Sequence, residues 1–298
     1  MELRENERLD YVNDDIELIQ NTEGLTFGTD ALLLAGYVNG KHAKGVELGG
    51  GTGIISMLLL ARDKVQNMDC IEIQDEYAEL IKRNAEHNGL GERLNAVCQD
   101  VREFRPEREC ELVISNPPYM KTTSGKENLK DKKNIARHEV AGTIYDFCHS
   151  GAKMLKYGGA FAVVYRPDRL IDLIDAMRKS GLEPKRMTYV HANENSEPSM
   201  VLIEAKKGGK CGLKLTKPLL IYKNTDNKDY SKDMSYIMEN GSSRKETLPQ
   251  RTQGRLPPEF VHHLDKTLGN DRASSCVFKL QIKKRMAKQG IELRGKSR

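Results

Sequence analysis

The residues of this chain best suited to chemistry are four in a row, Asn116-Pro117-Pro118-Tyr119, which directly follow a predicted strand at 111–115. The two prolines end that strand, stiffen the backbone and remove two N–H donors. The side-chain oxygen of Asn116 and the carbonyl oxygen of Pro117 could together accept both hydrogens of a planar –NH2 group, and Tyr119 offers a ring for stacking. The turn could therefore hold an amine or amide with its nitrogen facing an electrophile, although Asn-Pro turns are also common ends of strands.

A glycine-rich turn lies upstream, in Val46-Glu-Leu-Gly-Gly-Gly-Thr-Gly53, between a predicted strand and a predicted helix. Gly49, Gly51 and Gly53 allow a tight turn with positive φ and let a ligand approach the backbone closely. Their G-x-G-x-G spacing differs from the G-x-G-x-x-G of dinucleotide sites. Glu47, two residues before the first glycine, would repel a pyrophosphate. It suits a ligand with a cationic amino group, such as S-adenosyl-L-methionine (AdoMet), whose sulfonium methyl group would be the electrophile.

Two further carboxylates follow the next predicted strands. Glu72 stands in the apolar run Cys70-Ile-Glu-Ile73, nineteen residues after Gly53. A carboxylate there can accept two hydrogen bonds from a ribose diol, and burying it unpaired would be costly. Asp100, just after the third strand, is placed to accept from an adenine amino group, or is an ordinary turn aspartate.

The elements that must position these residues alternate between strands and helices from residue 44 onward. We expect strands at 44–48, 68–73, 94–98, 111–115, 160–165, 185–191 and 199–206, and helices at 54–62, 75–87, 144–155 and 168–180. An earlier helix begins at Ala31 with Thr29 or Asp30 as its N-cap. This alternation predicts an α/β fold of parallel βαβ units, a Rossmann-like seven-stranded sheet with helices on both faces. The polar turn at 192–198 predicts that the last two strands form an antiparallel hairpin.

Three regions follow from the same pattern. Residues 1–43 form an N-terminal segment and helix that we expect to pack on the core. We expect residues 44–241 to form the domain that carries both turns and binds the cofactor, and residues 242–298 to form a basic extension that is poorly ordered. Residues 243–298 hold fourteen Lys and Arg against five Asp and Glu, whereas residues 1–242 hold 34 against 38. The extension therefore accounts for the net charge of +5.

Composition excludes several classes of protein. No stretch approaches the roughly 18 apolar residues of a membrane span. Because the N-terminus is acidic and polar, we expect no secretory signal. The six cysteines include no C-x-x-C pair, which favours free thiols in a reducing cytosol over a zinc site or disulfides. We therefore expect a cytoplasmic protein without a membrane contact and without a metal.

The segment 119–139 is long, polar and rich in lysine. A connection of this length inside a compact domain is usually functional or mobile. We expect its cations to contact phosphates of a nucleic acid, although a solvated loop would have the same composition. These cations are Lys121, Lys126, Lys130, Lys132, Lys133 and Arg137. His138 could orient a substrate or have a structural role beside Glu139.

These motifs together resemble a known family. Glu7-Arg-Leu-Asp10, the segment 27–35, the glycine turn, Ile71-Glu-Ile-Gln74, Ser115-Asn-Pro-Pro-Tyr119 and Ala136-Arg-His-Glu139 are similar to the corresponding segments of tRNA1(Val) adenine-37 N6-methyltransferases. That family is part of the class I AdoMet-dependent N-methyltransferases with an N-P-P-Y motif. The resemblance covers about residues 7–241. Glu47 replaces the Asp more often seen at its place, and the extension after residue 241 departs from the family.

The resemblance implies a class I methyltransferase fold that binds AdoMet and methylates an adenine N6 in the anticodon loop of a tRNA. We infer no obligate protein partner. By position, AdoMet would be held by Glu47, Gly49, Gly51, Gly53, Glu72 and Asp100. The catalytic residues would be Asn116, Pro117 and Tyr119, and further substrate contacts would come from Pro118, Lys121, Arg137 and His138.

Three alternatives stay open on the sequence. Because the Asn-Pro-Pro-Tyr turn suits any planar –NH2 group, the substrate could be a protein glutamine side chain. It could also be an adenine or a guanine N2 of ribosomal RNA. A non-catalytic RNA-binding protein that retains the pocket is a third reading, and the intact glycine turn and Asn116 speak against it.

Overall fold

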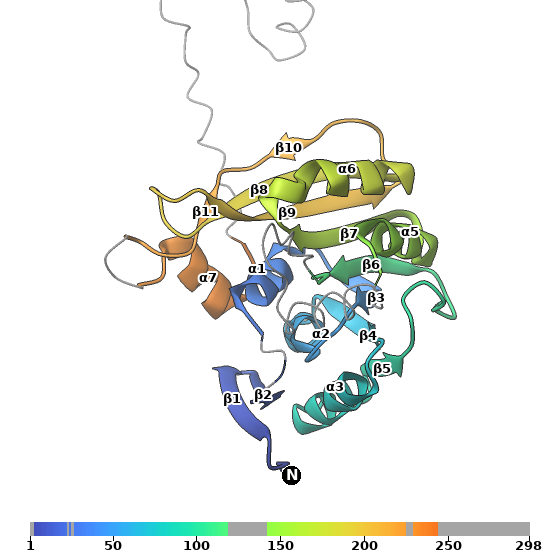
Figure 1. Cartoon of the computed structure of the whole chain (residues 1–298), viewed down its shortest axis with the longest axis vertical. Helices are drawn as coiled ribbons and strands as arrows, with labels where there is room; N and C mark the ends of the chain where they lie inside the picture. The colour runs from blue at the N-terminus through green and yellow to red at the C-terminus, as the bar shows by residue number, and fades with distance from the viewer. Residues whose placement is uncertain (1–2, 23, 25–26, 119–141, 225–228, 244–298) are drawn as a thin grey trace, which may run out of the picture. The chain divides into compact units, whose positions relative to one another are not determined.

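The central sheet is built from parallel strands that alternate with helices, as the sequence predicts (Figure 1). The computed structural model describes residues 3–243 apart from 23, 25–26, 119–141 and 225–228. All described residues belong to one compact unit, residues 1–244. Five parallel strands lie in the order β7-β6-β3-β4-β5. Their bounds are β3 His42–Leu48, β4 Val65–Glu72, β5 Leu94–Cys98, β6 Cys110–Ser115 and β7 Leu155–Tyr165.

The predicted antiparallel hairpin is present. β8 (Leu182–His191) and β9 (Pro198–Lys207) pair antiparallel, and β9 inserts between β7 and β8. Two short strands, β10 (Lys214–Leu215) and β11 (Leu219–Leu220), then pair with β8. The sheet therefore has nine strands among the described residues, where the sequence predicts seven. Strands of two residues are too short to leave a periodic pattern.

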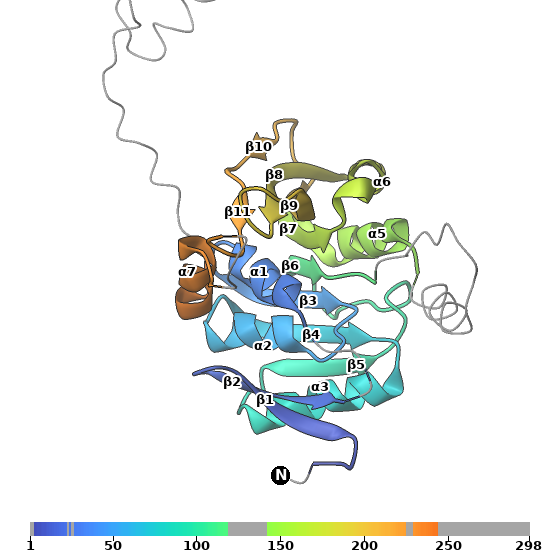
Figure 2. The same ribbon diagram turned by 60° about the vertical axis from the view of Figure 1, so that its left-hand side comes forward.

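Helices cover both faces of the sheet (Figure 2). Buried residues of β7 alternate between the two layers: Ala160, Ala162 and Val164 pack with α1, α2 and α7, whereas Phe161 and Val163 pack with α5 and α6. This alternation explains why the strand is apolar without a break from Ala160 to Val164. The helices are α1 Thr29–Tyr37, α2 Ile54–Ala61, α3 Asp75–His87, α5 Ile144–Met154, α6 Leu170–Lys179 and α7 Lys232–Asn240, with a short 3-10 turn at Pro167–Arg169. In the described part of the chain, no helix is long and apolar enough to cross a membrane.

An N-terminal hairpin, which the sequence pattern does not predict, packs against α3. β1 (Glu7–Asn13) and β2 (Ile16–Asn21) pair antiparallel. Two asparagine side chains, one in α3 and one at its C-cap, bind the backbone of β2 as a neighbouring strand would. Asn84 bonds both N–H and C=O of Ile19 at 2.7 and 3.1 Å, and Asn88 does the same for Glu17 at 3.0 and 2.7 Å.

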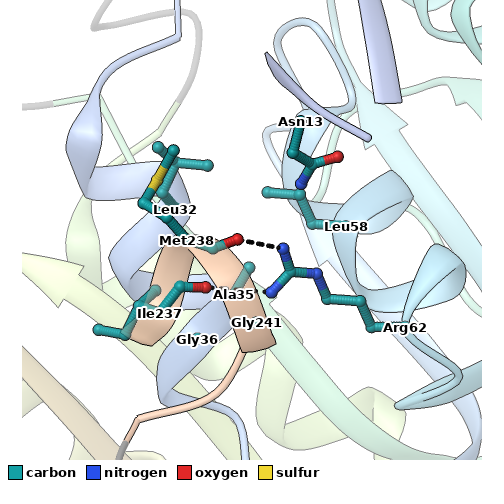
Figure 3. Close-up of a pocket in the computed structure, with 9 residues that line it drawn as sticks. All are labelled: Asn13, Leu32, Ala35, Gly36, Leu58, Arg62, Ile237, Met238 and Gly241. Carbon is teal, nitrogen blue, oxygen red and sulfur yellow. Dashed lines mark hydrogen bonds between the residues drawn. The ribbon is translucent and has the colours of Figure 1, made fainter. Parts of the chain in front are cut away.

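Cationic side chains hold the carboxyl ends of two helices. Nζ of Lys64 donates to the carbonyls of Ala35 and Val38 at the end of α1, at 2.9 and 2.8 Å, and burial lowers the pKa of Lys64 to about 8. Arg186 donates to the Tyr37 carbonyl at 2.6 Å and lies 3.6 Å from the Tyr37 ring centre. Arg62 caps α7 in the same way (Figure 3): it donates to the last-turn carbonyls of that helix at 2.9 and 3.1 Å. Such contacts stabilise helix ends because they satisfy orphan carbonyls and oppose the negative end of the helix dipole.

Candidate active site

The candidate residues converge because the strands that precede them end level with one another. Leu48 of β3 is in register with Ser115 of β6 on one side and with Ile71 of β4 on the other. The next residues along the chain are Gly49, Asn116 and Glu72. The Ser115 hydroxyl donates to the Leu48 carbonyl at 2.9 Å, and the Ser115 side chain is fully buried. The two turns singled out in the sequence therefore leave adjacent strands at the carboxyl edge of the sheet, where open α/β folds bind ligands.

The glycine-rich turn has the backbone conformation that its spacing predicts. Gly49, Gly51 and Gly53 have φ angles of 75°, 55° and 80°, in the left-handed region. The Gly51 backbone N–H donates to Oε2 of Glu72 at 3.0 Å. Apart from Gly51 and its two neighbours in the chain, no atom of the described residues lies within 4 Å of the place where a Cβ of Gly51 would stand. A ligand can therefore approach this backbone directly.

Glu47 is buried behind this turn, with 1% of its surface exposed. Its Oε2 accepts hydrogen bonds from the backbone N–H and the hydroxyl of Ser56, at 2.9 and 2.5 Å, in the first turn of α2. Burial raises the pKa of the Glu47 carboxyl to about 7, and the Ser56 bonds partly offset that effect. The carboxylate therefore holds the start of α2, and a contact between Glu47 and a cationic amino group stays a prediction.

Glu72 is also buried, but it is paired. Besides the bond from Gly51, its Oε1 accepts from the Gln74 backbone N–H at 3.0 Å. Its two oxygens offer about four acceptor sites, so the pairing leaves capacity for ribose hydroxyls.

Asp100 bonds the backbone and guanidinium of Arg102, whose side chain is 45% exposed, and these bonds lower the pKa of the Asp100 carboxyl below its ordinary value. For Asp100 to bind an adenine amino group, Arg102 must share the carboxylate or swing out into solvent.

Asn116 has a partner that local sequence reasoning missed. Its Nδ2 donates to Oδ2 of Asp30 at 2.8 Å, although Asp30 belongs to α1. The sequence predicts Thr29 or Asp30 as the N-cap of α1, and this is wrong: the N-cap is Gly28, with no side-chain cap. Pro117 is buried and Pro118 is exposed.

The other predicted substrate contacts lie outside the described residues. These are Tyr119, Lys121, Arg137 and His138, together with the remaining lysines of 119–139. The described part of the site thus consists of the glycine turn, the three carboxylates, Asp30 and the turn from Asn116 to Pro118.

A family model described as the methyltransferase small domain matches residues 22–178, more than half of the chain. The chain belongs to this methyltransferase family. The match spans every described residue of the candidate site, from Asp30 to Pro118.

Among solved structures, the chain is similar to one described as a predicted O-methyltransferase, Atu636 from Agrobacterium tumefaciens. The TM-score is 0.59 and the identity 21%, and the match covers 74% of this chain and all of that one. This likeness supports the class I methyltransferase fold.

Curated relatives of the family are similar over the same region. A tRNA1(Val) (adenine(37)-N6)-methyltransferase of Phocaeicola vulgatus is 28% identical over 180 residues, 60% of this chain and 76% of the relative. One of Aliivibrio fischeri is 30% identical over 182 residues, 61% of this chain and 77% of the relative.

The residues present fit AdoMet, the methyl donor of class I methyltransferases. The open space at Gly51 admits a ligand against the backbone, and the Glu72 carboxylate stands beside it at the end of β4. When bound, AdoMet supplies a methyl group on a positively charged sulfur. We expect the glycine turn, Glu72 and Asp100 to hold it.

Proposed function

We propose that this methyltransferase modifies the exocyclic N6 of an adenine in tRNA, at adenine 37 of the anticodon loop. One observation carries the proposal: the turn that begins at Asn116 leaves β6 directly beside the glycine turn of β3, with Ser115 bonded to Leu48 between them. An amine held by the first turn would face a cofactor held by the second.

The role of Asn116 and Pro117 follows from the chemistry of an aromatic amine. The lone pair of such an amine is conjugated with the ring, so the nitrogen is a poor nucleophile. Hydrogen bonds from its two N–H groups to the Asn116 side-chain oxygen and the Pro117 carbonyl would favour a more tetrahedral nitrogen and fix its direction. Positioning of the reacting groups supplies much of the rate. No strong base is needed, because the methylated ammonium loses its proton readily.

The choice of substrate is supported by the relatives, whose names specify adenine 37 of tRNA1(Val). A base in an anticodon loop must leave its stack to reach the turn, at a cost of a few kcal/mol. We propose that stacking on Tyr119 offsets part of this cost, and that the lysines of 119–139 bind the neighbouring phosphates. A tRNA substrate is also consistent with a cytoplasmic location.

The test is transfer of labelled methyl groups from AdoMet to separated pools of tRNA, ribosomal RNA and protein, each from a strain that lacks this gene. We expect N6-methyladenosine in the tRNA pool with the wild-type chain, and a loss of at least a hundredfold with Asn116→Ala, comparable to removing a principal transition-state hydrogen bond. Label in ribosomal RNA or in glutamine of protein would overturn the substrate. Near-full turnover by Asn116→Ala would overturn the role of the turn.

A further inference from the structure

Asp30 contacts the acceptor turn from a distant part of the chain. It lies in the first turn of α1, 86 residues before Asn116, and its Oδ2 accepts the 2.8 Å hydrogen bond from Nδ2 of Asn116. Its Oδ1 accepts a 2.9 Å hydrogen bond from the backbone N–H of Ala31. One carboxylate oxygen is thus held by its own helix, and the other holds Asn116.

The residue before α1 leaves space for this arrangement. A Cβ added to Gly28 would lie 2.7 Å from Oδ1 of Asp30, closer than such atoms approach. The Gly28 backbone is extended, with φ −116° and ψ 179°, a conformation that any residue adopts. A side chain at position 28 would therefore meet the Asp30 carboxylate and push it from this place, whereas glycine leaves the space to the carboxylate.

The helix that carries Asp30 is fixed at its other end. Lys64 and Arg186 bind the last carbonyls of α1, and the buried residues Leu33 and Leu34 anchor the middle of the helix in the core. Asp30 therefore reaches Asn116 from a firmly held element rather than from a free loop.

We propose that Asp30 is a positioning residue for methyl transfer, which sets the orientation of the Asn116 carboxamide; this inference rests on the proposed function of Asn116. An ionised carboxylate can only accept hydrogen bonds, so it selects the orientation in which the amide –NH2 faces α1. The amide oxygen is then the end presented to the target amine. In the reversed orientation, N–H donors of Asn116 would meet N–H donors of the substrate. The bond to the carboxylate also polarises the amide and strengthens its oxygen as an acceptor.

An exchange of the two side chains tests the proposal. In Asp30→Asn the backbone N–H of Ala31 still holds the side-chain oxygen, so the new –NH2 faces Asn116 and favours the reversed orientation of its carboxamide. We expect turnover to fall roughly tenfold to a hundredfold. In Asn116→Asp two carboxylates face each other, and turnover should fall further. The double variant Asp30→Asn/Asn116→Asp restores one donor and one acceptor and still presents a carboxylate oxygen to the amine. We expect it to exceed both single variants in turnover.

Gly28→Ala provides a second probe that keeps both side chains. The added methyl group displaces the Asp30 carboxylate, and we expect turnover to fall several-fold with unchanged affinity for AdoMet and tRNA. Asp172→Asn, an exposed aspartate in the first turn of α6 paired with Arg169, is the matched control and should retain wild-type turnover. All variants are compared as full-length chains, with kcat measured on tRNA and Kd for AdoMet measured by calorimetry.

The outcomes separate the inference from the function on which it rests. Rescue in the double variant, with AdoMet affinity constant throughout, supports positioning through Asn116. If the wild type methylates adenine N6 in tRNA but the double variant is no better than the worse single variant, the inference is wrong and the proposed function stands. If Asp30→Asn lowers AdoMet affinity as much as turnover, Asp30 serves the cofactor and the inference is wrong. If the wild type labels no tRNA, the proposed function fails and the inference fails with it.

Discussion

Replacing Asn84 with alanine would remove a side chain that connects three segments. Its carboxamide bonds the N–H and C=O of Ile19 in the N-terminal hairpin. The same Nδ2 donates to the carbonyl of Thr52, inside the glycine-rich turn, at 3.2 Å. Asn84 is fully buried, so no water from bulk solvent takes over these contacts. The change should therefore lower stability and loosen the cofactor turn together.

The magnitude follows from the groups left unpaired. A buried backbone donor or acceptor that loses its partner costs about 1–3 kcal/mol. Asn84→Ala leaves three such groups without this partner: the N–H and C=O of Ile19 and the C=O of Thr52. The N-terminal hairpin and the glycine-rich turn can relax only in part around the missing side chain. We expect the free energy of unfolding to fall by about 3–5 kcal/mol, a large share of the 5–15 kcal/mol typical of a domain. Asn84→Asp should cost no less, because it keeps the acceptor for the Ile19 N–H but turns a buried carboxylate oxygen toward the carbonyls of Ile19 and Thr52.

Denaturation in urea, followed by circular dichroism, measures this change, and calorimetry measures AdoMet binding to the folded variant. Asn88→Ala is the control, since Asn88 makes the same pair of bonds to Glu17, where the backbone is exposed and water can replace them. It should cost about 1 kcal/mol or less. If the free energy of unfolding falls by less than about 1 kcal/mol for Asn84→Ala, or by the same amount for both variants, the buried hydrogen bonds of Asn84 do not stabilise the fold as proposed.

Three further predictions concern the site. Glu72→Gln turns an –NH2 toward the backbone N–H of Gly51 or of Gln74, so the Kd for AdoMet measured by calorimetry should rise at least about tenfold; an unchanged Kd would contradict the role of Glu72. Burial raises the pKa of Glu47 to about 7 from an ordinary 4.5, so the folded chain holds this proton more tightly than the unfolded chain. Without AdoMet, the unfolding free energy of the wild type should therefore decrease by about 3 kcal/mol, relative to that of Glu47→Gln, as pH rises between these two pKa values. Both chains are measured in the same denaturation series, and parallel pH profiles would show that the pKa of Glu47 is not raised. Finally, tRNA affinity titrated against salt should fall steeply if the lysines of 119–139 bind phosphates, and a flat dependence would count against those contacts.

Elements with a strong local pattern could be predicted from the sequence. The helix Asp75–His87 and the strand Leu94–Cys98 have the predicted bounds. For that helix, acidic residues in its first turn and Asn88-Gly89 after its last turn mark the ends. The convergence of the glycine turn, Glu72 and Asn116 was also predictable, because each follows a buried strand of one parallel sheet.

Contacts between distant residues could not be predicted in this way. The hairpin of β1 and β2 alternates charged and apolar residues over short strands. Backbone groups on the outer edge of β2 are bonded by Asn84 of α3 and by Asn88 at the C-cap of that helix. Asp30 has the local pattern of a helix cap, yet its carboxylate bonds Asn116. Glu47 has the pattern of a ligand residue, yet it bonds Ser56 in the helix that follows. In each case a partner far along the chain, or the burial of the group, decided the contact.

We propose that the Asn116 turn directs methylation to an adenine N6 in the anticodon loop. The most direct test is to isolate tRNA1(Val) from a strain lacking the gene, and from the same strain complemented with the wild-type chain or with Asn116→Ala, and to map modified bases by mass spectrometry. We expect N6-methyladenine at position 37 only with the wild-type chain. Persistence of that base in the deletion strain, or its full restoration by Asn116→Ala, would contradict it.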